Sequence, residues 1–296
     1  MGAVLPLTRR RPTRLRDNAE LRRSVDRMSS VPTPDAGQSG VLMWRPSEHV
    51  VELILDRPGA LNAVSTDLAS RLGGMLRAIA ADAAVRAVVL SSSQERAFCV
   101  GADLKERAGF SNEQLLEQRP VIRGMFSALL DLPMPVIAAV GGFALGGGFE
   151  LALSCDLIVA DETAVFGLTE VTVGLVPGGG GTQLLARRIG AGRAADLVLT
   201  GRKVDAPEAF RLGIVDRPAT AVHVRQLALD IAATIEGNSP LAVRYAKHAL
   251  RSGLDTPLHD GLEIEDAAWR AAAMSADRRE GITAFTEKRA PRWTGQ

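Results

Sequence analysis

The sequence predicts an α/β fold, and three observations support this. Short apolar runs of strand length alternate with segments of helical periodicity from about residue 41 to residue 220. A glycine-rich turn joins one apolar run to a helix, which favours a parallel arrangement of strands, and from residue 222 onward only helical patterns follow. With 296 residues, the chain is long enough for one large domain with a substantial core.

The first part of the chain predicts two strands, a loop and then alternating elements. The expected strands cover residues 41–45, 49–56 and 85–91, with a proline–glycine loop at 56–62. Thr66 or Asp67 should cap a helix that ends near Ala81. Residues 94–101 are expected to form a loop, and a longer helix should follow Ser111 and end near Leu130.

The second part centres on residues 135–170. An apolar run at 135–140 predicts a strand, residues 141–148 a glycine-broken turn, 149–156 a helix and 157–160 a second strand. Another glycine run occupies 177–181. The remaining elements are expected as helices at 182–189, after Gly190, at 206–213, 222–235, 240–251, 258–274 and 277–288, with a short strand at 214–215.

Residues 1–38 differ from the rest and predict a disordered extension. Eight arginines fall between Arg9 and Arg27 against three acidic residues. A transit peptide, a nucleic-acid-binding arm or an upstream start relative to Met28 would each explain this composition, and we favour the last. The catalytic core is then expected over residues 39–235 and a C-terminal helical region over 236–296.

Composition excludes several classes of protein. The formal net charge is +1, which gives no reason to expect nucleic acid or a membrane surface as a partner. No apolar run approaches the roughly 18 residues that span a bilayer. Cys99 and Cys155 lack metal-binding or redox spacing, and free cysteines fit a reducing, cytoplasmic compartment. The four histidines are scattered, so no metal site is expected.

The glycine turn suits a ligand that develops negative charge. Glycines at 146–148 allow close backbone approach, and the first N–H groups of the following helix lack intrahelical partners. Glu150 lies in the first turn of that helix. The order of residues matches neither a Walker loop nor a dinucleotide fingerprint. A tight turn that only packs a helix on a strand remains the alternative.

Together, several motifs resemble the crotonase superfamily, and specifically the enoyl-CoA hydratases. They are residues 55–58 with 60–62 (LDRP, ALN), 97–106 (AFCVGADLKE), 146–150 (GGGFE), 177–183 (PGGGGTQ) and 277–289 (DRREGITAFTEKR). The resemblance runs from about residue 41 to the end. It implies a spiral of ββα turns, with a C-terminal helical region that builds homotrimers, commonly paired into homohexamers.

The resemblance also implies residue roles. The backbone N–H groups of Ala102 and Gly147 would form an oxyanion hole, and Glu150 and Glu170 would be the two catalytic carboxylates. Each glutamate alone has a plain alternative, as a helix-dipole partner or a solvated loop charge. The positions that the resemblance assigns to substrate binding are Arg57, Ala60, Ala102, Asp103, Leu104, Gly146, Phe285 and Lys288, the last two reaching a neighbouring subunit's substrate.

The implied reaction is addition of water across the 2,3 double bond of a 2-enoyl-CoA thioester. No cofactor is implied, because CoA is part of the substrate. A Δ3,Δ2-enoyl-CoA isomerase is the alternative enzyme, and motifs at 101–108 and 287–293 are closest to 3-methylglutaconyl-CoA hydratases. An RNA-binding protein is the non-enzyme alternative. The segment 65–84, where one such hydratase carries an RNA-binding lysine-rich helix, has arginines but no lysine here.

Overall fold

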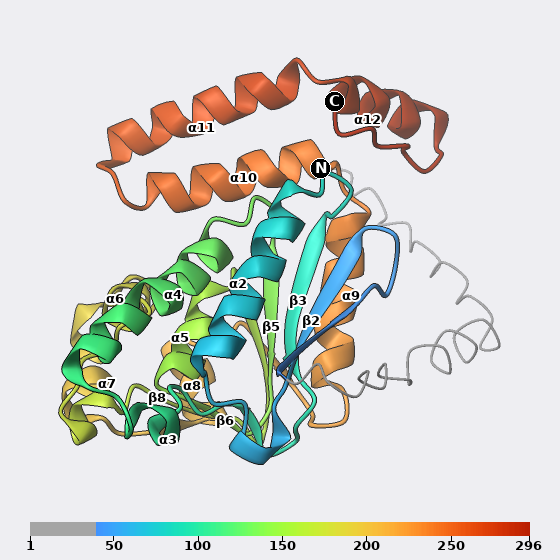
Figure 1. Ribbon diagram of the computed structural model, residues 1–296. Helices are drawn as coiled ribbons and strands as arrows, with labels where there is room; N and C mark the ends of the chain where they lie inside the picture. The colour runs from blue at the N-terminus through green and yellow to red at the C-terminus, as the bar shows by residue number, and fades with distance from the viewer. Residues whose placement is uncertain (1–39) are drawn as a thin grey trace, which may run out of the picture. The chain divides into compact units, whose positions relative to one another are not determined.

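The computed structural model describes residues 40–296 (Figure 1). The extension predicted for residues 1–38 lies outside the described residues. The strands are β1 (Gly40–Trp44), β2 (Val50–Asp56), β3 (Ala87–Ser92), β4 (Ala97–Cys99), β5 (Val136–Val140), β6 (Phe143–Leu145), β7 (Leu157–Asp161), β8 (Val165–Gly167), β9 (Val204–Asp205) and β10 (Arg217–Ala219). The α-helices are α2 (Thr66–Ala81), α3 (Leu104–Arg107), α4 (Asn112–Leu130), α5 (Gly147–Ser154), α6 (Gly181–Ile189), α7 (Ala191–Thr200), α8 (Ala206–Leu212), α9 (Val224–Glu236), α10 (Pro240–Gly253), α11 (Leu258–Ala273) and α12 (Ala276–Glu287). Two 3-10 helices are η1 (Pro58–Ala60) and η2 (Glu170–Val173).

Two sheets run through the core. The larger has the strand order β1-β2-β3-β5-β7-β10, and the smaller has the order β4-β6-β8-β9. Consecutive strand pairs β3–β4, β5–β6 and β7–β8 each place one strand in each sheet, and a helix or helical turn follows every pair. Each sheet therefore grows by one parallel strand per ββα turn, with antiparallel neighbours only at β1 and β9. This is the ββα spiral that the resemblance implied.

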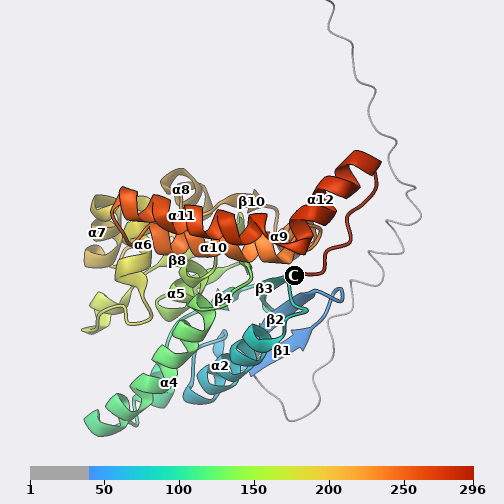
Figure 2. The ribbon, with the colours of Figure 1, turned by 90° about the horizontal axis from the view of Figure 1, so that it is seen from above.

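Helices cover both faces of the larger sheet. Helix α9 packs along β2, β3, β5, β7 and β10, and α2 lies on the opposite side beside α4 (Figures 1 and 2). Helix α2 buries a stripe at Leu68, Leu72 and Leu76, which are four residues apart and so share one helical face. That face enters the apolar core formed by the sheet strands. The helix that was expected to end near Ala81 is therefore present, with its apolar face in the core.

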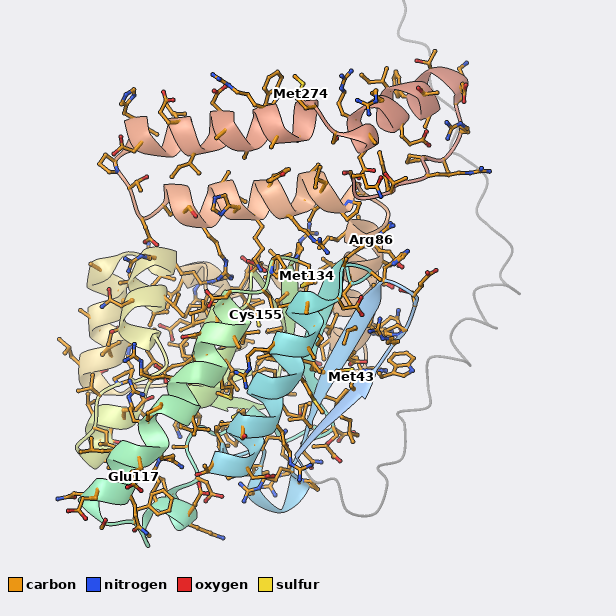
Figure 3. All side chains as sticks on the ribbon, turned by 45° about the horizontal axis from the view of Figure 1, so that its top comes forward. Met43, Arg86, Glu117, Met134, Cys155 and Met274 are labelled. Atoms are coloured by element: carbon orange, nitrogen blue, oxygen red, sulfur yellow. The ribbon has the colours of Figure 1, made fainter. Side chains whose placement is uncertain are left out.

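The C-terminal helices begin with a buried ionic anchor. Lys247 of α10 pairs with Asp156 at 2.7 Å. Its Nζ donates to the carbonyl of Met134 at 2.8 Å, and Met134 lies at the end of the core next to α10 (Figure 3). Arg251 pairs with the other oxygen of Asp156 at 2.8 Å. Helix α11 packs antiparallel along α10 (Figure 1). Several large apolar side chains on these helices are exposed in the single chain: Leu250, Leu254, Leu258, Trp269 and Met274. The domain boundary at residue 235 stays a prediction.

Some local expectations were wrong. Residues 214–215 do not form a strand, because their N–H groups donate to the carbonyl of Ala209 and close α8, and β10 begins two residues later. The expected loop at 94–101 contains β4, and the glycine turn contains β6. Each has three residues, too few for an alternating pattern. Ser65, rather than Thr66 or Asp67, caps α2 by accepting the N–H of Leu68.

The two cysteines are free and buried. Burial raises the pKa of each thiol to about 12. Cys99 also donates its S–H to the carbonyl of Asn62 at 3.0 Å. Both thiols therefore stay protonated and serve as packing groups. Within residues 40–296, no helix combines the length and the apolar character needed to cross a membrane.

Candidate active site

Three adjacent strands of the smaller sheet bring candidate residues to one edge. Strands β4, β6 and β8 run parallel in that order, so their carboxyl ends lie side by side. Ala102 follows the end of β4 by three residues, Gly147 follows β6 by two, and Glu170 follows β8 by three. Residues that are far apart in sequence therefore meet at one edge, where ligands commonly bind in parallel sheets.

The N–H groups of Ala102 and Gly147 converge at this edge. A side chain on Gly147 would begin 3.9 Å from the Ala102 nitrogen and 3.9 Å from Oε2 of Glu150. Within residues 40–296, neither N–H group donates to another protein atom. Gly101 makes the approach possible, because it has a φ of +89° and its Cβ would lie 2.8 Å from the Leu145 carbonyl oxygen. Two N–H groups without a partner among the described residues therefore lie close together.

Helix α5 is fixed against β4 by the absence of a side chain at Gly148. A Cβ there would lie 2.0 Å from the carbonyl oxygen of Cys99, well inside contact distance. Gly146 precedes the helix with a φ of +50°, donates its N–H to Gly167 and accepts that of Glu150. The glycines at 146–148 therefore set the position of the helix start, which lies two residues earlier than residue 149.

Glu150 is 2% exposed and is held by the second glycine run. Its Oε1 accepts the N–H groups of Gly179 at 2.7 Å and Gly181 at 2.8 Å. Burial raises the pKa of this carboxyl, while the N–H groups of Gly181, Gly179 and Gly178 and the charge of Arg119 oppose the rise. Since Oε1 is occupied by two donors, Oε2 is the oxygen that remains toward Gly147.

Glu170 faces Gly146 across the same space. A side chain on Gly146 would begin 3.2 Å from Oε1 of Glu170. Burial, with a smaller contribution from the negative charge of Glu150, raises the pKa of Glu170 to about 7. Its Oε2 is buried without a hydrogen-bond partner among residues 40–296. Two carboxyls with different hydrogen-bond environments therefore share one site, an arrangement suited to separate acid and base roles.

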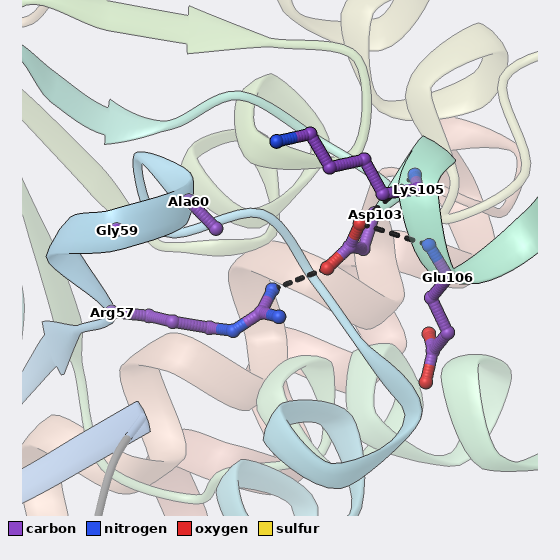
Figure 4. Close-up of a pocket in the computed structure, with 6 residues that line it drawn as sticks. All are labelled: Arg57, Gly59, Ala60, Asp103, Lys105 and Glu106. Carbon is purple, nitrogen blue, oxygen red and sulfur yellow. Dashed lines mark hydrogen bonds and ion pairs between the residues drawn. The ribbon is translucent and has the colours of Figure 1, made fainter.

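A pocket of about 510 Å³ opens beside this edge (Figure 4). It is lined by Arg57, Gly59, Ala60, Asp103, Lys105 and Glu106. Asp103 caps α3 by accepting the N–H groups of Lys105 and Glu106, and it pairs with Arg57 at 2.6 Å. The Lys105 ammonium forms no ion pair within the described part of the chain. A free cation over a pocket wall suits an anionic ligand such as a phosphate.

The structure gathers most of the predicted binding positions. Arg57, Ala60 and Asp103 line the pocket, and Leu104 begins α3 beside them with 55% of its surface exposed. Phe285 and Lys288 do not line it. They lie at the end of α12, where Phe285 is 86% exposed (Figure 1). The contact of these two residues with a neighbouring subunit's substrate stays a prediction.

Other residues of the site had no assigned role in the sequence interpretation. Gly179 and Gly181 hold Glu150, and Arg119 donates to Gly178 at 2.7 Å. The run of four glycines was the available signal, but its partner could not be read without the fold. Among residues 40–296, no cluster of histidine, cysteine, aspartate and glutamate could hold a metal ion.

Comparison with known proteins agrees with this architecture. Residues 45–296 match the model of the enoyl-CoA hydratase/isomerase family. The chain is 44% identical over 249 residues to the Bacillus subtilis protein YngF, covering 84% of this chain and 96% of that one. It is 38% identical over 251 residues to human mitochondrial methylglutaconyl-CoA hydratase, covering 83% and 74%. A solved enoyl-CoA hydratase from Bacillus anthracis superposes with a TM-score of 0.85 at 43% identity, covering 87% and 100%.

The chain therefore belongs to the enoyl-CoA hydratase/isomerase family and has the crotonase fold. It is an enzyme of that type, acting on acyl-CoA thioesters.

Proposed function

We propose that this enzyme is an enoyl-CoA hydratase, which adds water across the 2,3 double bond of a 2-enoyl-CoA. One observation carries the proposal: a buried carboxyl, Glu150, and a half-buried one, Glu170, lie beside the Ala102 and Gly147 N–H groups, which have no partner among residues 40–296. A hydratase needs such a combination, because hydration requires removal of a proton from water and delivery of another to carbon. An isomerase needs only one carboxyl.

The N–H groups of Ala102 and Gly147 would hold the thioester oxygen. Attack at Cβ moves electrons onto that oxygen, so donors placed there stabilise the enolate-like transition state more than the ground state. Removing one such donor typically costs about 10²–10³ in rate. Both donors come from the backbone, and their positions are set by β4 and α5 rather than by rotamers.

The carboxyls would divide the proton transfers. Glu150, with Oε1 held by two N–H groups, would accept the proton of the attacking water on Oε2. Glu170, with a pKa near 7, is half protonated at neutral pH and would deliver a proton to Cα. After one turnover Glu150 carries the extra proton and Glu170 has lost one. A proton must then return between the two carboxyls, directly or through water.

The CoA part of the substrate would occupy the pocket beside Arg57, Ala60, Asp103 and Lys105. No step of this reaction needs a cofactor. The exposed apolar faces of α10 and α11 favour assembly into homotrimers or homohexamers, in which Phe285 and Lys288 would approach a neighbouring subunit's substrate. A cytoplasmic location remains a prediction.

Substrate choice has one specific indication. The identity of 38% to human methylglutaconyl-CoA hydratase favours a branched short-chain enoyl group as one candidate. A steady-state comparison of crotonyl-CoA, longer 2-enoyl-CoA thioesters and 3-methylglutaconyl-CoA would rank these substrates by kcat/KM.

The proposal is tested with Glu150→Gln and Glu170→Gln. Both substitutions keep the shape of the side chain and remove its acid–base function, so each should lower kcat for crotonyl-CoA hydration by about 10²–10⁴-fold while the circular dichroism spectrum is unchanged. Wild-type kcat/KM should also decline above pH 7, where Glu170 loses the proton it donates. Full activity in either variant would refute the assigned role.

A further inference from the structure

Arg119 of α4 lies over the second glycine run. Its Nη2 donates to the carbonyl oxygen of Gly178 at 2.7 Å. A side chain on Gly178 would begin 2.9 Å from Nη1 and 3.3 Å from Cζ of the same guanidinium. The guanidinium therefore occupies the space that a Cβ at residue 178 would need. This contact joins α4 to the loop that holds Glu150.

The contact acts on a single peptide group. The carbonyl of Gly178 and the N–H of Gly179 belong to the same planar trans peptide, so they point in opposite directions. Arg119 donates to one end of this peptide, and the other end donates to Glu150 Oε1 at 2.7 Å. Hydrogen bonds in such a chain polarise and strengthen one another.

The glycines on both sides of this peptide group allow it to adopt more than one orientation. Consecutive glycines at 178–181 adopt many backbone conformations at little cost, so the sequence of the loop does not by itself fix the peptide orientation. A reversed peptide would aim the Gly178 carbonyl at Glu150 and remove one of its two donors. A cation that binds the carbonyl on the outer side stabilises the orientation seen here.

We propose that Arg119 is a positioning residue that holds the Gly178–Gly179 peptide with its N–H toward Glu150, and so keeps this carboxylate oriented and ionised for catalysis. The inference rests on the proposed role of Glu150 as the base. Arg119 itself contacts the loop and acts through it.

The charges around Glu150 support this role. Glu170 on η2 is the neighbouring acid, and Arg119 is the cation that lowers the pKa of Glu150. Arg107 of α3 lies near Arg119 and binds Gln118 through Nε at 3.0 Å.

The two arginines of α6 are engaged away from Glu150. Arg187 pairs with Asp255 and Arg188 pairs with Asp216. Arg119 is thus the basic side chain whose removal should raise the pKa of Glu150 most directly.

The first test compares Arg119→Met with Arg119→Lys and with Arg123→Met. Arg119→Met should lower kcat for crotonyl-CoA by about tenfold, the scale of one lost hydrogen bond, with little change in KM. The acidic limb of its kcat–pH profile should move to higher pH.

Arg119→Lys keeps the positive charge, so its loss in kcat and its shift in the pH profile should both be smaller than those of Arg119→Met. Arg123 lies one turn further along α4, is exposed and forms no ion pair among residues 40–296, so Arg123→Met should match the wild type.

A second test disrupts the contact between Arg119 and Gly178 by a substitution in the loop. Gly178→Ala places a methyl group against the flexible end of Arg119, so the guanidinium should be displaced. This variant should reproduce the kcat loss of Arg119→Met. The double variant should lose little more than either single variant, because both remove the same interaction. Losses that multiply in the double variant would overturn the inference.

The inference also has a readout that does not depend on turnover. Infrared titration can follow the Glu150 carboxyl through the difference between each protein and its Glu150→Gln derivative. The titration midpoint should lie at higher pH in Arg119→Met than in wild type or Arg123→Met. An unchanged midpoint would overturn the role of Arg119. A wild-type protein that fails to hydrate any enoyl-CoA would instead overturn the proposed function, and the titration would still decide the inference.

Discussion

The carboxyl of Glu170 lies against the backbone of Gly146, with Oε1 3.2 Å from the point where a side chain on that glycine would begin. Gly146 has a φ of +50° and no side chain to meet this carboxyl, whose Oε2 is buried without a partner among residues 40–296. Such an arrangement costs stability in the folded protein, because burial disfavours the charged form. It also produces the pKa near 7 that a proton donor needs at neutral pH.

Stability should therefore depend on pH through Glu170. Its pKa is about 7 in the folded protein and 4.5 ordinarily, so between these values the folded state binds more protons than the unfolded state. The free energy of unfolding should fall as pH rises through this window. Glu170→Gln removes that slope and should be more stable than wild type above pH 7, on the order of 1–3 kcal/mol once solvent screening of this half-buried carboxyl is allowed for. Urea unfolding at pH 4.5, 6 and 8 measures the difference, and equal slopes for both proteins would contradict it.

Neighbouring glycines should respond in opposite ways. Gly147→Ala places a methyl group no closer than 3.7 Å to any described atom, so the protein should fold normally. The methyl would project between the Ala102 N–H and Glu150, where the thioester is proposed to bind, and kcat/KM should fall at least 10²-fold. Gly148→Ala instead meets the Cys99 carbonyl at 2.0 Å and should be destabilised by several kcal/mol. Thermal unfolding beside activity separates the two effects, and a destabilised but active Gly147→Ala protein would contradict the assignment.

Lys105 should contribute to substrate affinity without affecting the chemical step. Its ammonium lines the pocket beside Arg57, whose charge is already paired with Asp103. Lys105→Met should raise KM for crotonyl-CoA by about tenfold, the scale of one charge-assisted contact to phosphate, while kcat stays the same. Crotonyl-pantetheine lacks the nucleotide phosphates and is the matched control. If Lys105→Met weakens both substrates equally, the pocket does not bind the nucleotide.

The Asp156 anchor should be important for stability. Asp156→Asn keeps the side-chain volume but leaves the buried Lys247 and the partly buried Arg251 without a counter-charge, which should cost about 3 kcal/mol. Lys247→Met removes the buried charge itself and should cost less, because Arg251 still neutralises Asp156. Arg270→Ala breaks an exposed pair with Asp266 and should change stability by less than about 1 kcal/mol. Urea unfolding of the three variants gives this order, and a tolerant Asp156→Asn protein would contradict it.

Elements whose sequence pattern follows a single rule could be predicted from the sequence. Helices α2 and α4 carry apolar spacing over many turns, and the parallel pair β5 and β7 flanks the glycine turn as expected. Strands β4 and β6 were missed because a segment of three residues is too short to carry a readable period. Without these two strands the sequence could not show how the site is assembled, because β4 and β6 bring Ala102 and Gly147 together.

The candidate catalytic residues could be predicted from sequence motifs. The residues that contact them could be identified only from the fold. The sequence marked Glu150 and the run of four glycines as separate features, 28 positions apart at the nearest. Only the packing of α5 beside α6 shows that the run donates to this carboxylate. The contact between Arg119 and Gly178 has no local signal at all, because an exposed arginine on a helix is ordinary.

Chemical labelling offers a way to follow the folded state of every variant named above. Cys99 and Cys155 are the only thiols in the chain, and both are buried and protonated in the native protein. Iodoacetamide should react with them only when β4 or the end of α5 opens. The rate of alkylation, measured by mass spectrometry, would then report how often β4 and the end of α5 open, without a further cysteine being introduced.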